Sequence, residues 1–150
     1  MKILSLDCGT KTGWSTGYIS GVEEFAVKRG ESPGMRFLKF RGWLSTMLEI
    51  LPDIKVIIYE QAHHRGGAAT ACGVGMVTVV LEFAAQHNIE TMSVHSGTLK
   101  KYATGKGNAG KPEMIAEAIN RGYSPIDDNE ADAQLMLEYA MEKLGIERVT

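Results

Sequence analysis

Met1-Lys-Ile-Leu-Ser-Leu-Asp-Cys-Gly-Thr10 opens the chain with a short apolar run that ends at one carboxylate, Asp7, and a glycine turn. The apolar residues between Ile3 and Leu6 predict a buried strand, because such a run ending at a turn signal is typical of one. A carboxylate is rarely buried unpaired, since removing its charge from water is costly. We therefore expect Asp7 either to cap the turn at Gly9 or to belong to a site at the end of this strand.

Size, charge and cysteine content narrow the class of protein. The 150 residues fit one domain, residues 1–150, which is long enough to bury a core of its own. Cys8 and Cys72 are too few for a disulfide framework and lack the spacing of metal ligands, so we expect a reducing, cytoplasmic environment. No segment has the pattern of a signal peptide and no apolar run reaches the length of a membrane span, so no membrane partner is expected. The net charge of -2 excludes a generally basic nucleic-acid binder, and a polyanion site must come from local clusters of Lys and Arg.

Strand and helix patterns alternate along the rest of the chain and predict an α/β protein. Glycine-punctuated segments at residues 14–20 and 22–27 predict two strands that form an antiparallel meander with the first. Residues 54–59 predict a parallel strand buried on both faces, and residues 90–94 predict an edge strand. Apolar spacing and helix-end signals predict helices over residues 35–51, 68–86, 96–103 with Ser96 as its cap, from Lys111-Pro112 onwards, and over about 128–144.

Acidic residues stand where these elements end or begin. Glu60 follows the parallel strand as Asp7 follows the first strand, and ligands of open α/β sheets bind outside the carboxyl ends of strands. The last helix opens with Asp127-Asp-Asn-Glu-Ala-Asp132, in which Asp128 and Asp132 share a face, whereas Asp127 favours the helix N-terminus. Asp7, Glu60 and Asp132 would supply the oxygen ligands of two Mg²⁺ or Mn²⁺ ions about 4 Å apart, the arrangement used for attack of water on a phosphodiester.

A basic segment precedes that helix. Residues 97–111 contain Lys100, Lys101, Lys106 and Lys111, several glycines and no acid. Such a segment is suited to a phosphate backbone, and the alternative is a solvated lysine-rich loop.

Four segments together resemble the RuvC-type Holliday junction resolvases of the RNase H-like superfamily, in particular short phage-type members. They are Ile3-Leu-Ser-Leu-Asp-Cys-Gly-Thr-Lys-Thr-Gly, Tyr59-Glu-Gln, Leu99-Lys-Lys-Tyr-Ala-Thr-Gly-Lys-Gly-Asn-Ala-Gly-Lys and Glu130-Ala-Asp-Ala. The resemblance implies an RNase H-like fold, with a five-stranded mixed sheet flanked by helices, and a two-fold homodimer. It also implies a crossover junction endodeoxyribonuclease that depends on Mg²⁺, with two ions per site, and makes paired nicks in four-way DNA junctions during recombination, repair or phage DNA processing.

The same resemblance implies roles for individual residues. Asp7, Glu60 and Asp132 match metal-binding catalytic acids, while Lys100 and Lys111 match basic residues near the scissile phosphate, with Lys111 also taking part in catalysis. Further contacts with DNA are expected from Lys101, Lys106, His63 and Arg65. In this chain His63 and His64 stand where such resolvases often have an aromatic wedge.

The fourth acid departs from the family pattern, because the position three residues before Asp132 is Asn129. At about 100° per residue from Asp132, Asp128 lies about 40° away, Asn129 about 60° and Glu130 about 160°. We therefore predict Asp128 as the fourth metal ligand, with Asn129 and Glu130 as the alternatives.

Two other protein classes share part of this pattern. The opening strand with Asp7 is also similar to that of YqgF-type RNA nucleases, which act in ribosomal RNA processing. It is similar, too, to that of actin-like ATP-binding proteins, for which residues 7–13 would form the nucleotide site. A non-catalytic binder of branched DNA is a further alternative.

Overall fold

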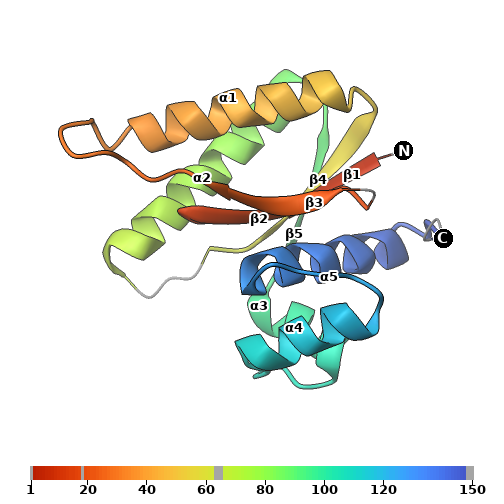
Figure 1. Ribbon diagram of the computed structural model, residues 1–150. Helices are drawn as coiled ribbons and strands as arrows, with labels where there is room; N and C mark the ends of the chain where they lie inside the picture. Colours follow the sequence, from red (N-terminus) through yellow and green to blue (C-terminus); the bar gives the residue numbers. More distant parts are fainter. Residues whose placement is uncertain (1, 18, 63–65, 148–150) are drawn as a thin grey trace.

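The computed structural model describes residues 2–17, 19–62 and 66–147. They form one five-stranded mixed sheet in the order β3-β2-β1-β4-β5, in which β1, β2 and β3 are antiparallel and β1, β4 and β5 are parallel (Figure 1). The elements are β1 Lys2–Asp7, β2 Lys11–Ser15, β3 Ser20–Glu24, α1 Met35–Ile50, β4 Ile54–Glu60, α2 Gly67–Gln86, β5 Glu90–Val94, α3 Ser96–Thr104, α4 Lys111–Asn120 and α5 Asp128–Lys143.

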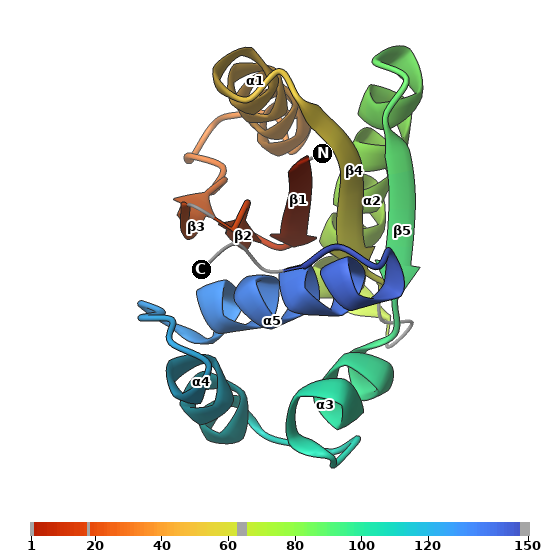
Figure 2. The same ribbon diagram turned by 90° about the vertical axis from the view of Figure 1, so that its right-hand side faces the viewer.

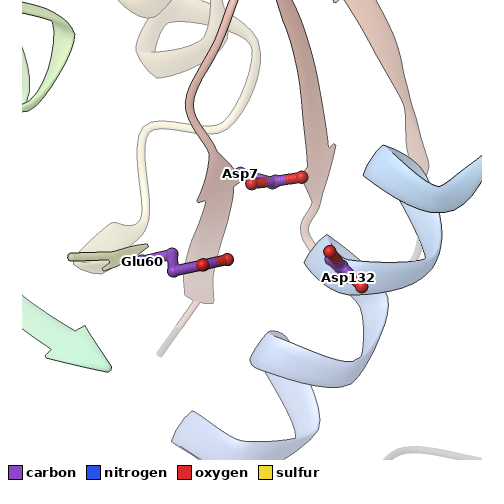
Figure 3. A group of neighbouring side chains, drawn as sticks. All are labelled: Asp7, Glu60 and Asp132. Atoms are coloured by element: carbon purple, nitrogen blue, oxygen red, sulfur yellow. The ribbon is translucent and has the colours of Figure 1, made fainter. Parts of the chain in front are cut away.

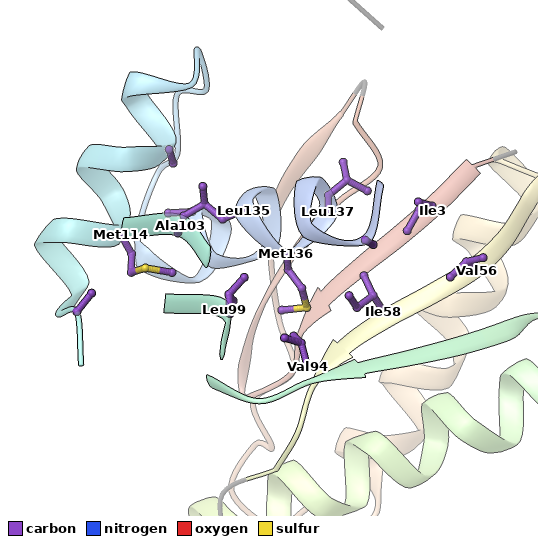
Figure 4. Close-up of a cluster of buried hydrophobic side chains, with 14 residues drawn as sticks. Ile3, Val56, Ile58, Val94, Leu99, Ala103, Met114, Leu135, Met136 and Leu137 are labelled. Atoms are coloured by element: carbon purple, nitrogen blue, oxygen red, sulfur yellow. The ribbon is translucent and has the colours of Figure 1, made fainter. Parts of the chain in front are cut away.

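Helices cover both faces of the sheet, with α1 and α2 on one side and α5, followed outwards by α3 and α4, on the other (Figures 1 and 2). Each side has its own buried core. Phe40 and Met76 belong to the core on the α1–α2 side, while Met136 lies with Ile58 and Val94 in the core on the α5 side (Figure 4). The predicted α/β fold with an antiparallel meander and an edge strand at residues 90–94 is confirmed.

Alternation along β1 decides which way Asp7 faces. Ile3 belongs to the core under α5 and Leu4 to the core under α1 and α2, while the Ser5 hydroxyl donates a hydrogen bond to the Ala133 carbonyl of α5. Since side chains of a strand alternate between the two faces, Asp7 lies on the α5 face. The same alternation in β4, with Ile58 under α5, places Glu60 on that face as well.

Three predicted boundaries were wrong. The second and third strands span 11–15 and 20–24 rather than 14–20 and 22–27, because the register of β2 against β1, Ser5 with Ser15, places the turn after Ser15. The cap of α3 is His95, whose Nδ1 accepts a hydrogen bond from the Gly97 N–H at 3.1 Å, and Ser96 is already helical.

The helix α2 has a composition that the sequence prediction overlooked. By length and by a mean hydropathy of 1.7 over 18 residues it would be apolar enough to cross a membrane. Here one face of α2, with Val80 and Phe83, packs into the core, while Val74 and Leu81 on its other side are 43% and 42% exposed.

Gly13 of β2 lets the N-terminal turn of α5 approach the sheet. A Cβ atom at Gly13 would lie 1.9 Å from the backbone oxygen of Asn129, so any other residue forces the helix and the strand apart. Gly42, in contrast, is exposed in the middle of α1 with no heavy atom within 4 Å of such a Cβ.

We expect Gly13→Ala to lower the free energy of unfolding by at least about 2 kcal/mol, because backbone atoms cannot move aside as a flexible side chain can. The matched control Gly42→Ala should be neutral or stabilising by up to about 1 kcal/mol, since alanine favours a helix. Denaturant unfolding measures both. Equal effects of the two substitutions would contradict the close approach of α5.

Candidate metal centre

Three carboxylates from three separate elements meet at the carboxyl end of the parallel strands. Asp7 ends β1, Glu60 ends β4 and Asp132 lies in the second turn of α5, and one ligand oxygen of each lies within 4.8 Å of the others (Figure 3). Because β1 and β4 are neighbours in a parallel register, with Leu6 beside Tyr59, their last residues lie side by side. The structure thus brings together the three acids that the sequence analysis selected.

Burial and mutual repulsion make it unfavourable for all three carboxylates to be charged when no cation is bound. Burial raises the pKa of Asp7 well above its usual range, and the charges of Asp132 and Glu60 raise it further. Burial likewise raises the pKa of Asp132 to about 7, with Glu60 and Asp128 adding to the effect, while Lys100 and Lys111 lower it. A bound cation would remove most of this cost.

The donor set fits such a cation. Asp132 Oδ1 is buried and, within the described part of the chain, has no hydrogen-bond partner. A buried carboxylate oxygen normally has one, so this atom is suited to ligate an ion. Three carboxylates and no thiolate or imidazole suit Mg²⁺ or Mn²⁺, and the neighbouring Cys8 thiol stays protonated because burial raises its pKa.

The residues considered as fourth ligand differ in their surroundings. Glu130 is 4% exposed and accepts hydrogen bonds from the Ser20 hydroxyl and the Ile126 N–H, both at 2.7 Å. The Asn129 amide donates to Asp127, which in turn caps α5 by accepting from the Glu130 N–H. The Asp128 carboxylate is 26% exposed and raises the pKa of both Asp7 and Asp132. It lies outside the compact group of three but near it, so its role as a ligand stays a prediction.

Two of the four predicted lysines lie close to these acids. Lys100 of α3 lines the same cavity as Asp7 and Glu60, and Lys111 Nζ at the start of α4 lies 3.7 Å from Asp128 Oδ2. Lys101 and Lys106 are exposed farther along α3 and the loop after it. The predicted contacts His63 and Arg65, like His64, lie outside the described residues.

Sequence reasoning missed the residues that hold the basic segment in place. Arg121, just after α4, donates to Glu117 at 2.8 Å, to Glu138 of α5 at 2.9 Å and to the Ala103 carbonyl of α3 at 3.3 Å. Its guanidinium also lies 5.1 Å from the centre of the Tyr102 ring. Because Ala103 and Glu138 are 17 or more residues from Arg121 in the sequence, only the folded chain shows that Arg121 ties α3 and α4 to α5.

Known proteins match this chain in structure but not in sequence. No family model matches the sequence, and no curated protein sequence matches it. The solved structure of Thermus thermophilus RuvC matches with a TM-score of 0.74 and 17% identity, over 99% of each chain. T. thermophilus RuvC in complex with a Holliday junction substrate matches with a TM-score of 0.75 and 17% identity, over 97% of this chain and 96% of the other.

These matches define the fold class. The chain has an RNase H-like fold that matches RuvC over nearly its whole length, with the sheet order and strand directions described above. The acidic cluster on this fold is consistent with a nuclease and could bind metal ions.

Removing one charge from the cluster should stabilise the protein when divalent ions are absent. The pKa of folded Asp132 is raised to about 7, so the folded state keeps this proton up to that pH, whereas an unfolded aspartate loses it near its usual pKa of 3.8. The folded state thus binds more protons in this window, and stability falls as the pH rises through it.

We expect Asp132→Asn in EDTA to melt several degrees above the wild type at about pH 8, since 1 kcal/mol corresponds to about 2–4 °C for a chain of this size. Mg²⁺ should raise the Tm of the wild type and have much less effect on the variant. Glu90→Gln, at the opposite end of β5, is the control and should behave like the wild type. A variant that melts below the wild type at high pH in EDTA would contradict the repulsion described above.

Proposed function

We propose that this protein is a Mg²⁺-dependent crossover junction endodeoxyribonuclease that resolves four-way or other branched DNA by paired phosphodiester hydrolysis. The proposed setting is recombination, repair or phage DNA processing in the cytoplasm of a bacterium or of a phage-infected host. The observation that carries the proposal is the convergence of Asp7, Glu60 and Asp132 within 4.8 Å of one another. Its position on a fold that matches a resolvase solved with a Holliday junction supports the choice of substrate.

The acids would bind the metal ions. Asp7, Glu60 and Asp132, with Asp128 as the fourth ligand, would hold two Mg²⁺ ions, for which Mn²⁺ would substitute. When bound, these ions would supply an activated water and compensate the charge of the phosphate. Asp7 and Glu60 would bind the ions from the ends of β1 and β4, and Asp132 would bind them from α5.

The lysines would bind the nucleic-acid backbone. Lys111 is 79% exposed in its side chain and can move from Asp128 to a phosphate, where its charge would also stabilise the transition state. Lys100 faces the strand entering the cavity, and the exposed Lys101 and Lys106 would extend the contact along the backbone. We assign His63 and Arg65 to the same interface on the sequence pattern.

A homodimer matches the two equivalent strands of a four-way junction, because two-fold symmetry pairs the active sites. We propose the outer face of α2 as the interface. Val74 and Leu81 are seven residues apart, which places them on one face, and both are exposed. From the sequence, Gly73, Gly75, Ala69 and Ala71 of this helix permit the close packing of such an interface. A Cβ at Gly75 would collide with the Phe37 ring of α1, so Gly75 packs within the chain instead.

The first test is cleavage of labelled four-way junction, duplex DNA and single-stranded RNA with Mg²⁺ and with EDTA. We expect Mg²⁺-dependent paired nicks in the junction. Asp7→Asn and Glu60→Gln should each reduce cleavage by at least about 100-fold while leaving junction binding intact, because fewer charges repel the phosphates. Glu90→Gln is the control acid and should cut normally. Full activity of Asp7→Asn would falsify the proposal. Cleavage of RNA but not of DNA would favour the alternative function, a YqgF-type RNA nuclease.

The second test separates the candidates for the fourth ligand. Asp128→Asn should lower cleavage about tenfold or more and raise the Mg²⁺ concentration required. Of the three candidates Asp128, Asn129 and Glu130, Asp128 alone is expected to offer an anionic oxygen on the face of α5 that carries Asp132. Glu130→Gln should leave the turnover of folded protein unchanged but lower the Tm, because the buried carboxylate accepts two hydrogen bonds. The opposite pattern would mean that Glu130 faces the metal.

The third test addresses the dimer. Light scattering should give a dimer for the wild type and a monomer for Leu81→Asp, because a buried unpaired carboxylate costs several kcal/mol. Ile119→Asp is the matched control, since Ile119 is a 57% exposed residue on α4, across the sheet. A wild-type monomer, alone and with junction, would count against the proposed interface.

A further inference from the structure

The two helices that carry Lys100 and Lys111 form an outer layer of the molecule. Lys100 lies on α3 and Lys111 opens α4, and both helices lie on the far side of α5 from the sheet (Figure 2). Their buried apolar residues belong to the same core as those of α5; they are Leu99, Ala103, Met114 and Ala118. Because the hydrophobic effect is non-directional, polar contacts are needed to fix how such a layer is oriented on α5.

Arg121, directly after α4, makes polar contacts with all three helices. Its Nε donates within α4 to Glu117, its Nη1 donates to Glu138 of α5, and its Nη2 donates to the Ala103 carbonyl of α3. Nη1 also donates to the Tyr102 hydroxyl of α3 at 3.4 Å. The planar guanidinium presents its donors in a fixed fork, so one side chain sets the relative positions of three helices, which the single nitrogen of a lysine cannot do.

These contacts lie at the end of the helices away from the acidic cluster. Glu138 follows Asp132 by six residues, which is about 9 Å along α5. Arg121 follows Lys111 by ten residues, which is about 15 Å along α4. An effect of Arg121 on the site therefore has to pass through the helices that it joins.

The lysines are close enough to these anchors to be placed by them. Ala103 follows Lys100 by three residues, less than one turn, so holding the Ala103 carbonyl also holds the backbone that carries Lys100. At the start of α4, Lys111 Nζ lies 3.7 Å from Asp128 Oδ2 of α5. With Arg121 bound to Glu138 at its other end, α4 has a polar contact with α5 at both ends.

We propose that Arg121 is a positioning residue that holds Lys100 and Lys111 at a set distance from the acidic cluster by joining α3 and α4 to α5. The inference rests on the proposed function, in which both lysines bind phosphates of the DNA. Lysines that are already in place bind a phosphate backbone more tightly, because less freedom is lost on binding. Loss of Arg121 lets α3 and α4 shift on their apolar contacts, and the lysines then no longer meet the phosphates together.

Two glutamates that bind Arg121 form a matched pair for a first test. Glu138 accepts across helices and is 11% exposed in its side chain, while Glu117 accepts within α4 and is 25% exposed. Glu138→Gln and Glu117→Gln remove the same charge, so both change the general attraction of DNA equally. The Tyr123 hydroxyl, which also donates to Glu138, can still donate to an amide oxygen there. We expect Glu138→Gln to weaken junction binding and Glu117→Gln to leave it unchanged, because only Glu138 links α4 to α5.

The main experiment is a double-mutant cycle on the affinity for a labelled four-way junction in EDTA, measured over a series of salt concentrations. Arg121→Gln is made in the wild type and in a chain that carries Lys100→Ala and Lys111→Ala. In the wild type we expect it to weaken binding roughly fivefold or more and to make the salt dependence less steep, because fewer phosphate contacts form. In the chain without the two lysines we expect almost no further loss, since Arg121 acts only through them. The Mg²⁺-dependent rise in Tm should persist in Arg121→Gln, because the acids are unchanged.

Three results would overturn the positioning role. They are wild-type affinity of Arg121→Gln at every salt concentration, an equal loss with and without the two lysines, and a Tm that no longer responds to Mg²⁺, which would mean that Arg121 acts on the metal centre instead. Where Arg121→Gln does not fold, equal affinities of Glu138→Gln and Glu117→Gln overturn the inference.

The failure of the proposed function is a different result. A wild type that binds the junction but cuts no DNA with Mg²⁺ overturns the nuclease function alone, because the binding cycle still measures the positioning role. A wild type that binds no junction overturns both.

Discussion

The close contact of α5 with β1 and β2 is the constraint on which the site depends. Gly13 leaves no side chain between β2 and the Asn129 backbone, and Ser5 of β1 donates a hydrogen bond to the Ala133 carbonyl. Ala131 and Ala133 are fully buried at this contact. Small residues on both partners let the helix backbone lie directly against β2, and this close approach brings Asp132 near Asp7.

This packing forces like charges together, so the fold carries an electrostatic cost at its functional end. Asp7 and Asp132 both have raised pKa values because they are buried beside other acids. Lys100 and Lys111 offset part of the repulsion, and Arg121 holds the helices that carry them against α5. Hydrophobic packing elsewhere in the two cores stabilises an arrangement that the acids alone would oppose, as is usual where function demands a strained cluster.

Much of this site could be predicted because it follows from local periodicity. Two-residue alternation and a parallel pair of strands bring Asp7 and Glu60 to the same edge and face, and helical periodicity places Asp128 and Asp132 together. The close approach at Gly13, the cap at His95 and the Arg121 contacts could not be predicted, because each depends on residues that meet only after folding. The start of β2 was misplaced for the same reason, since pairing with β1 outweighs the glycine signal in the segment.

The likeness to RuvC and the acidic cluster are separate observations, since a TM-score compares backbone paths and takes no account of side chains. At 17% identity the backbone match could hold with any residues at the strand ends, yet carboxylates occupy all three positions that converge there. The two observations also bear on different parts of the proposed function. The proposed hydrolysis would depend on the acids of β1, β4 and α5, whereas the proposed dimer would depend on α2, which exposes Val74 and Leu81. Substitutions on the exposed face of α2 would therefore change the proposed assembly while the acidic cluster of Asp7, Glu60 and Asp132 stays intact.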